Sequence, residues 1–271
     1  MTAPTSRNSV RPVLSLALLL LTNHANAQLI AVSGAGATPL GISAARDEFR
    51  ADLGGGTVAG ANGSFGGLRR EINWDGVPSA SAAPNLLAGS FYNVNSPRGL
   101  ILSTPGTGFQ ASGASSDSGA GQPAAANFGN IDPTYTNTFQ PFSPQRLVTP
   151  LGSNIFDVTF FVPGTTIPAT VTGFGAVFAD VDQANVSSIR YFDRDNVSIG
   201  VYYAPVFSSG LSFLGAFTTS GQPTIARVRV TMGNTVLGAG ITDNNTTHDL
   251  VVSDDFIYGE PLDRIFANGF Q

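Results

Sequence analysis

The fold is decided by the stretch Ala226-Arg227-Val228-Arg229-Val230-Thr231-Met232, in which apolar residues alternate with polar ones. Successive side chains of a β-strand point to opposite faces, so a period of two predicts a strand with one buried face. The same alternation recurs at 156–162 and 197–203, where the apolar members are Phe156, Val158, Phe160 and Val162, then Val197, Ile199, Val201 and Tyr203. All three segments are therefore predicted to be half-buried strands.

Four further apolar runs bring the predicted strands of the second half to seven. They lie at 171–178, 186–192, 211–217 and 250–258, mostly separated by short turn-rich stretches. Short strands at regular spacing, with no helices between them, fit an antiparallel sandwich of two sheets better than a parallel sheet. Composition agrees, because only 11% of residues are charged while 32 are Gly, and strand surfaces need fewer charges than helix surfaces. We predict an all-β protein whose clearest strands span 154–258.

One short helix is predicted near the N-terminus. Its apolar stripe consists of Ile42, Ala45, Phe49 and Leu53. Ser43 can cap its first turn, and Gly54-Gly55-Gly56 stops it because glycine adopts left-handed conformations without strain. Residues 28–41 are rich in Gly and Ala and show little pattern; a short strand at 29–32 is one alternative within them, and the segment as a whole is predicted to be flexible. Residues 42–260 are predicted to form a single domain, followed by a tail at 261–271.

The first 27 residues have the layout of a secretory leader. Arg7 and Arg11 precede an apolar run at 13–21, and Ala25-Asn26-Ala27 supplies the small residues that a signal peptidase reads. The run is far shorter than the roughly 20 residues of a membrane-spanning helix, and no later segment approaches that length. We expect cleavage before Gln28 and an exported protein without a transmembrane segment, located outside the cell, on its outer surface or in the periplasm.

The charge of the chain excludes some partners. Without the leader, 244 residues carry 11 positive and 18 negative charges, a net charge of −7, and lysine is absent. Nucleic acids and anionic lipids are bound by clustered cations, so neither is expected as a partner. The chain also has no cysteine, which removes disulfides, thiol catalysis and thiolate metal sites.

Side chains that catalyse hydrolysis are scarce. His248 is the one histidine after the leader, and no Gly-x-Ser-x-Gly turn is present to supply the serine of a Ser-His-Asp triad. Zinc hydrolases usually need two or three histidines. His248 lies in the polar stretch 244–249, and we interpret it as a solvated loop residue.

Pairs of aspartates suggest a cation site. Asp180 and Asp182 follow a predicted strand, and Asp193 and Asp195 flank a predicted hairpin turn. Calcium takes about six to eight oxygen ligands, which loops at one end of a sandwich can supply. The alternative is that these aspartates accept backbone hydrogen bonds within their own turns. Asp254 falls on the apolar face of the last strand, so we interpret it as an inward carboxylate that binds the amides of a loop.

Glu71, Trp74 and Asp75 form the densest group of distinctive side chains in the first half. Two carboxylates are the machinery of a glycosidase, so Glu71 and Asp75 are the catalytic pair if the protein is an enzyme, with Asp180 and Asp182 as a second such pair. Without catalysis, Arg70, Trp74 and Asp75 are the candidate residues for binding a sugar. The structural alternative makes Trp74 a core residue and the charged residues around it surface ion pairs.

The second half resembles exported bacterial β-sandwich proteins of jelly-roll, lectin-like type, which often carry C-terminal sorting tails. The resemblance covers about 110 residues and is carried by 173–182, 189–193, 211–215, 225–228 and the closing Ser253-Asp254-Asp255-Phe256-Ile257-Tyr258-Gly259. It implies a jelly-roll-like sandwich, but sandwiches host adhesion, glycan-binding, matrix and enzymatic roles alike. The end of the chain, 263–271, also resembles a short ending of exported proteins and lacks the hydrophobic helix of the better-known sorting tails.

These observations favour binding over catalysis. The first expectation is a secreted or cell-surface, non-enzymatic module that binds a polysaccharide or cell-surface glycan, with calcium as its candidate cofactor. A secreted glycan-active hydrolase that uses a carboxylate pair is the second. A structural component of an envelope or biofilm layer, which would self-associate, is the third.

Overall fold

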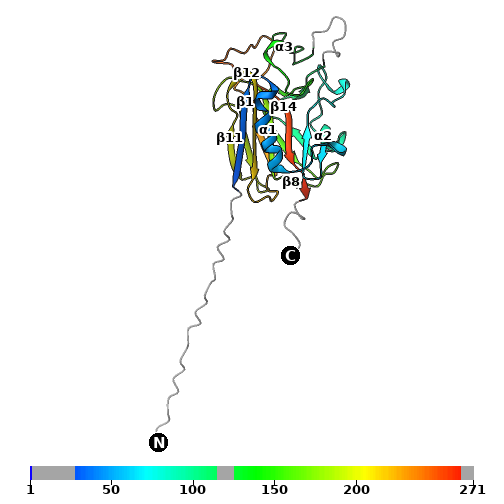
Figure 1. The fold of residues 1–271 in the computed structure, drawn as a ribbon, viewed down its shortest axis with the longest axis vertical. Helices are drawn as coiled ribbons and strands as arrows, with labels where there is room; N and C mark the ends of the chain where they lie inside the picture. The colour runs from blue at the N-terminus through cyan, green and yellow to red at the C-terminus, as the bar shows by residue number, and fades with distance from the viewer. Residues whose placement is uncertain (2–27, 115–124, 264–271) are drawn as a thin grey trace.

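The computed structural model describes Met1 and residues 28–114 and 125–263 (Figure 1). Nearly all of the predicted leader and residues 264–271 of the predicted tail lie outside the described residues. The described chain is mostly β, and its strands form two antiparallel sheets that pack together, as the sequence predicts. Within it, no helix is both long enough and apolar enough to cross a membrane.

The larger sheet has the order β1-β12-β9-β14-β3-β2, and β6 and β5 extend it beside β14. All of its pairings are antiparallel. Its strands are β1 (Leu29–Gly36), β2 (Ser64–Phe65), β3 (Arg69–Ile72), β5 (Gly108–Ala111), β6 (Val148–Leu151), β9 (Gly173–Val181), β12 (Phe207–Thr218) and β14 (Val252–Gly259).

The second sheet has the order β11-β10-β13-β7-β4, again antiparallel. Its strands are β4 (Leu100–Ser103), β7 (Ile155–Phe160), β10 (Ser188–Phe192), β11 (Ser198–Tyr203) and β13 (Arg227–Thr231). The predicted alternation is confirmed in β7 and β13, where Phe156 pairs with Val230 and both are buried. A small two-stranded sheet joins β8 (Ala169–Thr170) to β15 (Leu262–Asp263).

The face predicted for β11 is confirmed for Ile199, which packs against the main core, and is wrong from Gly200 onward, because the register with β10 shifts between Tyr191 and Phe192. Tyr202 pairs with buried Ile189 and Gly200 pairs with buried Tyr191, so these two residues face the core. Val201, assigned to the buried face from the pattern, pairs instead with exposed Arg190. The strand is at the edge of its sheet and has apolar residues on both faces, which leaves its period ambiguous.

The main core fills the space between the two sheets. Aromatic rings meet there, including Phe156 and Phe256, whose centroids lie 6.1 Å apart, and Phe174 and Phe256, at 5.2 Å. A second core lies on the outer face of the larger sheet, under α1 (Pro39–Leu53) and the loops before β6 and β14. Every residue of β9 and β14 is buried as a result, because both faces of these central strands are covered (Figure 1).

The predicted apolar stripe and end of the helix are confirmed. Its stripe is buried, Phe49 packs on Phe213 with centroids 5.5 Å apart, and Gly54 ends the helix at φ +80°. Its start is earlier than predicted, since Thr38 precedes it and Pro39 occupies its first turn. Ser43 is therefore no cap, and its hydroxyl donates to the Pro39 carbonyl inside the helix.

The segment 28–41, predicted to be flexible, is regular structure instead. Leu29–Gly36 form β1, which pairs with β12 along its whole length, and α1 begins three residues later. Its pattern is obscured because glycines replace side chains where α1 packs against it. A Cβ atom at Gly34 would lie 2.8 Å from the Ala45 Cβ, and one at Gly36 would lie 2.7 Å from the Gly41 Cα.

The first half contributes short elements that the sequence left mostly unassigned. β4 pairs with β7 at the end of the second sheet, and β5 pairs with β6 in the larger sheet. The structure also has helical turns beyond the single predicted helix: α2 (Phe91–Val94), α3 (Tyr135–Thr138), η1 (Ala61–Gly63) and η2 (Ser79–Ser81).

Candidate functional site

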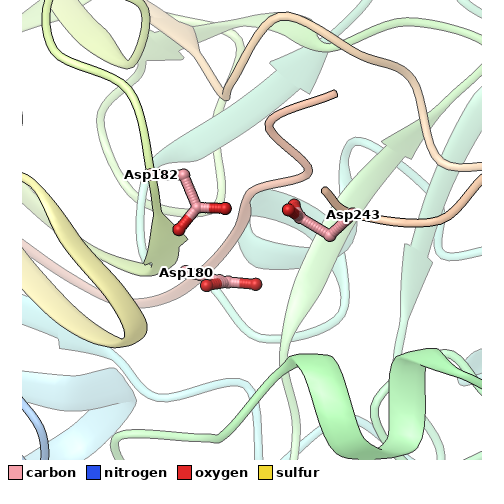
Figure 2. A group of neighbouring side chains, drawn as sticks. All are labelled: Asp180, Asp182 and Asp243. Atoms are coloured by element: carbon pink, nitrogen blue, oxygen red, sulfur yellow. The ribbon is translucent and has the colours of Figure 1, made fainter. Parts of the chain in front are cut away.

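Asp180 and Asp182 come together with Asp243 at one end of the sandwich. Each residue offers a carboxylate oxygen, and these oxygens all lie within 4.8 Å of one another. Figure 2 shows the three carboxylates converging, two from the end of β9 and its following turn and the third from the loop before β14. Among the described residues, this is the group of His, Cys, Asp and Glu side chains with the spacing of a metal site.

The position of Asp180 depends on an irregularity between two strands. The register of β9 and β12 shifts between Phe207 and Leu211, and Asp180 adopts φ +68° there. Its side chain is only 4% exposed, and its Oδ1 atom accepts the Ser209 backbone N–H at 2.6 Å. Aspartate tolerates left-handed backbone better than most residues, so the irregularity itself favours this residue type.

Asp243 is fixed by its own loop. Its Oδ2 atom accepts the backbone N–H of Leu250 at 2.7 Å and its Oδ1 atom accepts that of Asn245 at 3.0 Å. The Oδ1 atom of Asn244 accepts the backbone N–H groups of Thr246, Thr247 and His248, which holds the turn in place. His248 contacts the Thr242 carbonyl and takes no part in the cluster.

Asp249 joins the two loops of the cluster. It is fully buried and accepts the backbone N–H groups of Asp182 at 3.2 Å and of Gln183 at 3.1 Å. The turn after β9 is therefore held against the loop before β14. The distance between the Asp182 and Asp243 carboxylates follows from this attachment.

Burial and the like charges of their neighbours disfavour ionisation of the carboxyl groups in the cluster. Burial raises the pKa of Asp180 to about 7, and the Asp182, Asp243 and Asp249 charges add to the rise. Burial raises the pKa of Asp182 to about 6, and the charges of Asp243 and Asp249 add to the rise. Burial and the charge of Asp243 raise the pKa of Asp249 to about 6. No arginine forms an ion pair with these acids within the described ranges.

This donor set suits a hard divalent cation. Its donors are carboxylate oxygens, which Ca²⁺ and Mg²⁺ prefer, and it lacks the nitrogen and sulfur ligands of zinc sites. The Oδ2 atom of Asp182 is buried and has no hydrogen-bond partner in the described chain. The bonded oxygens of Asp180 and Asp243 retain further lone pairs, because a carboxylate oxygen has two. A bound cation would offset the repulsion between these carboxylates, which adds to the effect of burial on their pKa values.

Asp193 and Asp195 lie in the turn between β10 and β11 and are not part of the cluster. The Oδ1 atom of Asp193 accepts the backbone N–H groups of Asp195 and Val197, both at 2.9 Å. Asp195 is exposed and lies 3.7 Å from Arg194. These contacts are those of an aspartate that closes a hairpin turn, the alternative to calcium binding.

Trp74 is a core residue, which corrects its assignment to a ligand-binding surface. Its side chain is fully buried and meets Tyr92 and Phe256 edge to face, with centroids 5.2 and 5.0 Å apart. Its indole N–H donates to the Asp254 carbonyl at 2.9 Å. No face of the ring is left for a sugar.

The charged residues around Trp74 are engaged in the fold. Glu71 forms ion pairs with Arg50 at 2.6 Å and Arg69 at 2.9 Å. Arg70 pairs with Glu260 at 2.6 Å. Asp75 accepts the backbone N–H groups at 145 and 146, and its burial raises its pKa. Glu71 and Asp75, the predicted catalytic pair, thus each bind other parts of the fold.

The interpretation of Asp254 is confirmed. It is fully buried, and its Oδ2 atom accepts the backbone N–H groups of Phe142 at 2.6 Å and Ser143 at 3.2 Å. Asp255 is also buried, and its Oδ1 atom accepts the Ser143 hydroxyl at 2.7 Å. The two adjacent acids point to the same loop because the pairing of β14 with β9 shifts between Ser253 and Phe256.

No protein-family model matches the chain, and searches of curated proteins and of solved structures give no match either. The candidate site therefore rests on its own geometry. Sequence reasoning missed Asp243, which lies far from Asp180 along the chain. The signal that could have found it is the run Asp243-Asn244-Asn245, rich in oxygen donors, before the last predicted strand.

Proposed function

We propose that this protein is an exported, non-enzymatic β-sandwich module that binds calcium at Asp180, Asp182 and Asp243 and a polysaccharide or cell-surface glycan at the same end. The observation that carries the proposal is the convergence of three carboxylates within 4.8 Å of one another. Calcium bound there would hold together the turn after β9 and the loop before β14. The proposed location is the cell exterior, in keeping with the leader-like N-terminus and the jelly-roll, lectin-like resemblance.

Binding is favoured over catalysis by the state of the other acids. Glu71 and Asp75 have structural partners, and the chain offers one histidine after the leader and no cysteine. The loop beside the cluster carries exposed Asn245, Thr246 and Thr247, whose amide and hydroxyl groups can hydrogen-bond sugar hydroxyls. A calcium ion with open coordination positions would accept sugar hydroxyls as further oxygen ligands.

Calcium binding is tested by isothermal titration calorimetry of the purified, chelator-treated protein with CaCl₂. We expect one saturable site in the wild type and its loss in Asp182→Asn, which keeps the size of the side chain and removes its charge. Asp193→Asn is the matched control, since it removes an acid from a turn outside the cluster. No saturable heat in the wild type, or equal binding by Asp182→Asn, contradicts the calcium site.

Glycan binding is tested separately on a glycan array, with calcium and with a chelator. We expect bound glycans whose signal falls with the chelator and in Asp182→Asn, but not in Asp193→Asn. Glycan binding that is unchanged by the chelator would show that the glycan site does not depend on the cation site. An array without signal, together with a positive calcium titration, contradicts the glycan partner and leaves the cation site standing.

A further inference from the structure

β1 has an open outer edge. It forms one end of the larger sheet and pairs with β12 on its inner side, from Leu29 opposite Thr218 to Gly36 opposite Leu211. No strand of the described chain pairs with its outer side. Figure 1 shows β1 with α1 beside it on the face of the larger sheet and with β11, the edge strand of the second sheet, on its other side.

The hydrogen-bond pattern identifies the groups that point outward. The Gln28 carbonyl, opposite Thr219, accepts the Thr219 N–H at 3.1 Å, so every second residue from Gln28 bonds to β12. The alternate residues, Leu29, Ala31, Ser33 and Ala35, direct their N–H and C=O groups away from β12. The Tyr202 hydroxyl confirms this direction, because it approaches from β11 and donates to the Leu29 carbonyl at 3.0 Å.

Three residues of this edge remain unpaired on the outer side. Within the described chain, no hydrogen bond reaches the outward N–H and C=O groups of Ala31, Ser33 and Ala35. Ala31 and Ser33 are exposed and Ala35 is half-buried. Their side chains are small, so another backbone can approach closely.

The edge lacks the features that usually prevent strand pairing between molecules. Edge strands are normally protected by charged side chains, proline or bulges. β1 contains none of them, its register with β12 is unbroken, and no residue from Gln28 to Ala45 is charged. The acidic chain repels itself elsewhere, but this stretch carries no charge that would oppose a second copy.

We propose that two copies of this chain associate through β1, in an antiparallel pair centred on Ser33. An antiparallel pair of identical strands is two-fold symmetric, so one surface satisfies itself. With Ser33 opposite Ser33 of the second copy, Ala31 lies opposite Ala35 and the reverse. The outward N–H and C=O groups of Ala31, Ser33 and Ala35 then lie opposite the same groups of the second copy and can hydrogen-bond to them. The larger sheets of the two copies become one continuous sheet.

The test measures the mass of the purified protein by sedimentation velocity over a range of concentrations, together with amide hydrogen exchange. We expect a dimer whose dissociation constant rises at least tenfold in Ser33→Pro and in Ser33→Lys. Ser33→Pro removes an outward N–H and leaves the bonds to β12 intact, since proline is tolerated at strand edges where its nitrogen faces solvent. Val58→Lys is the control, because Val58 is 81% exposed and lies outside β1.

Hydrogen exchange localises the contact. Amides of Ala31, Ser33 and Ala35 should exchange at least tenfold more slowly in concentrated than in dilute protein, while the amides of residues 30, 32 and 34 change little. Circular dichroism establishes that each variant is folded, and Ser33→Lys carries the test if Ser33→Pro unfolds. A monomer at every concentration, or a dimer that neither variant weakens, overturns the proposal.

Discussion

The Oδ2 atom of Asp254 accepts the backbone N–H of Phe142 at 2.6 Å, which fastens the loop before β6 to the central strand β14. Burial, the charge of Asp255 and a hydrogen bond to Asp255 hold the pKa of Asp254 well above its usual range, which favours the protonated form of this carboxyl group. The same Oδ2 atom accepts the Ser143 backbone N–H at 3.2 Å, and the Ser143 hydroxyl donates to the Oδ1 atom of Asp255 at 2.7 Å. The acid pair is thus a fully hydrogen-bonded attachment for the loop.

Asp254→Asn should retain this attachment. The Asn side chain reproduces a protonated Asp, with a carbonyl for the amides of Phe142 and Ser143 and an amide donor for Asp255. We expect a free energy of unfolding within about 1 kcal/mol of wild type, whereas Asp254→Ala should lose about 2–4 kcal/mol because buried N–H groups lose their acceptor. Urea unfolding at pH 7 measures both. Equal losses in the two variants would contradict the protonated state.

Asp255 should make stability depend on pH. Burial, its leading cause, raises the pKa of Asp255 to about 6, above the usual value of an unfolded aspartate. A folded pKa above the unfolded one gives stability that is complete below about pH 4 and lost as the pH rises through about 6. Relative to Asp255→Asn, the wild type should lose roughly 1–3 kcal/mol between pH 4 and 7. Unfolding curves across this range measure the difference, and a difference independent of pH is the contrary outcome.

Trp74→Ala should unfold far more easily than wild type. Removing a fully buried indole leaves a cavity beside Tyr92 and Phe256, and such substitutions cost about 3–5 kcal/mol. Trp74→Phe should cost less, since it keeps most of the ring and loses the hydrogen bond to Asp254. Thermal unfolding by circular dichroism measures both, and the fluorescence of this single tryptophan should shift to the red on unfolding of the wild type. A wild-type-like melting curve for Trp74→Ala would place the residue outside the core.

Glu71→Gln should be costly while Asp47→Asn is not. Glu71 joins Arg50 on α1 to Arg69 on β3, and the Arg69 side chain is only 5% exposed. Losing the charge leaves a buried guanidinium poorly neutralised, for which we expect a loss of about 1–3 kcal/mol. Asp47 pairs with the same Arg50, but its side chain is 55% exposed, and exposed pairs contribute about 0–1 kcal/mol. Comparable losses in both variants, measured by urea unfolding, would contradict this reasoning.

The effect of Asp182→Asn on the melting temperature should change sign when calcium is added. Without a divalent cation, Asp182→Asn should raise the melting temperature, because it removes a like charge from beside Asp180 and Asp243. With saturating calcium the same substitution should lower it relative to wild type, because a ligand is lost. Differential scanning fluorimetry with a chelator and with CaCl₂ measures both differences. Asp195→Asn, at an exposed turn, should change little in either condition.

The strands that could be predicted are those whose environment is uniform along their length. One side of β13 and of β7 faces the core and the other faces solvent. Burial of one side requires an apolar residue at every second position, which gives these strands their period of two. Only the first half of β1 suggested a strand, and the buried face of β11 was assigned wrongly beyond Ile199, in each case for a local reason. Glycines stand in β1 where α1 approaches, and edge exposure lets β11 carry apolar residues on both faces.

The candidate site could be predicted only in part. Asp180 and Asp182 are near neighbours in the chain, so one turn places both. The third acid, Asp243, reaches them through the hydrogen bonds of Asp249 to the turn after β9, and no local pattern encodes that contact. The acids near Trp74 illustrate the converse, because close spacing in sequence suggested a site where the fold uses each charge for a separate contact.

By itself, the sequence determined the fold class, through alternating strands, few charges and many glycines, because burial of one strand face constrains every second residue. The sequence also determined which kinds of chemistry the chain has no side chains for, since the types of side chain present do not depend on folding. Only the tertiary structure decided which acids meet, that Trp74 is buried and that the edge of β1 is open. These depend on contacts between residues far apart in the chain, and the energy of such a contact appears only when both partners are in place.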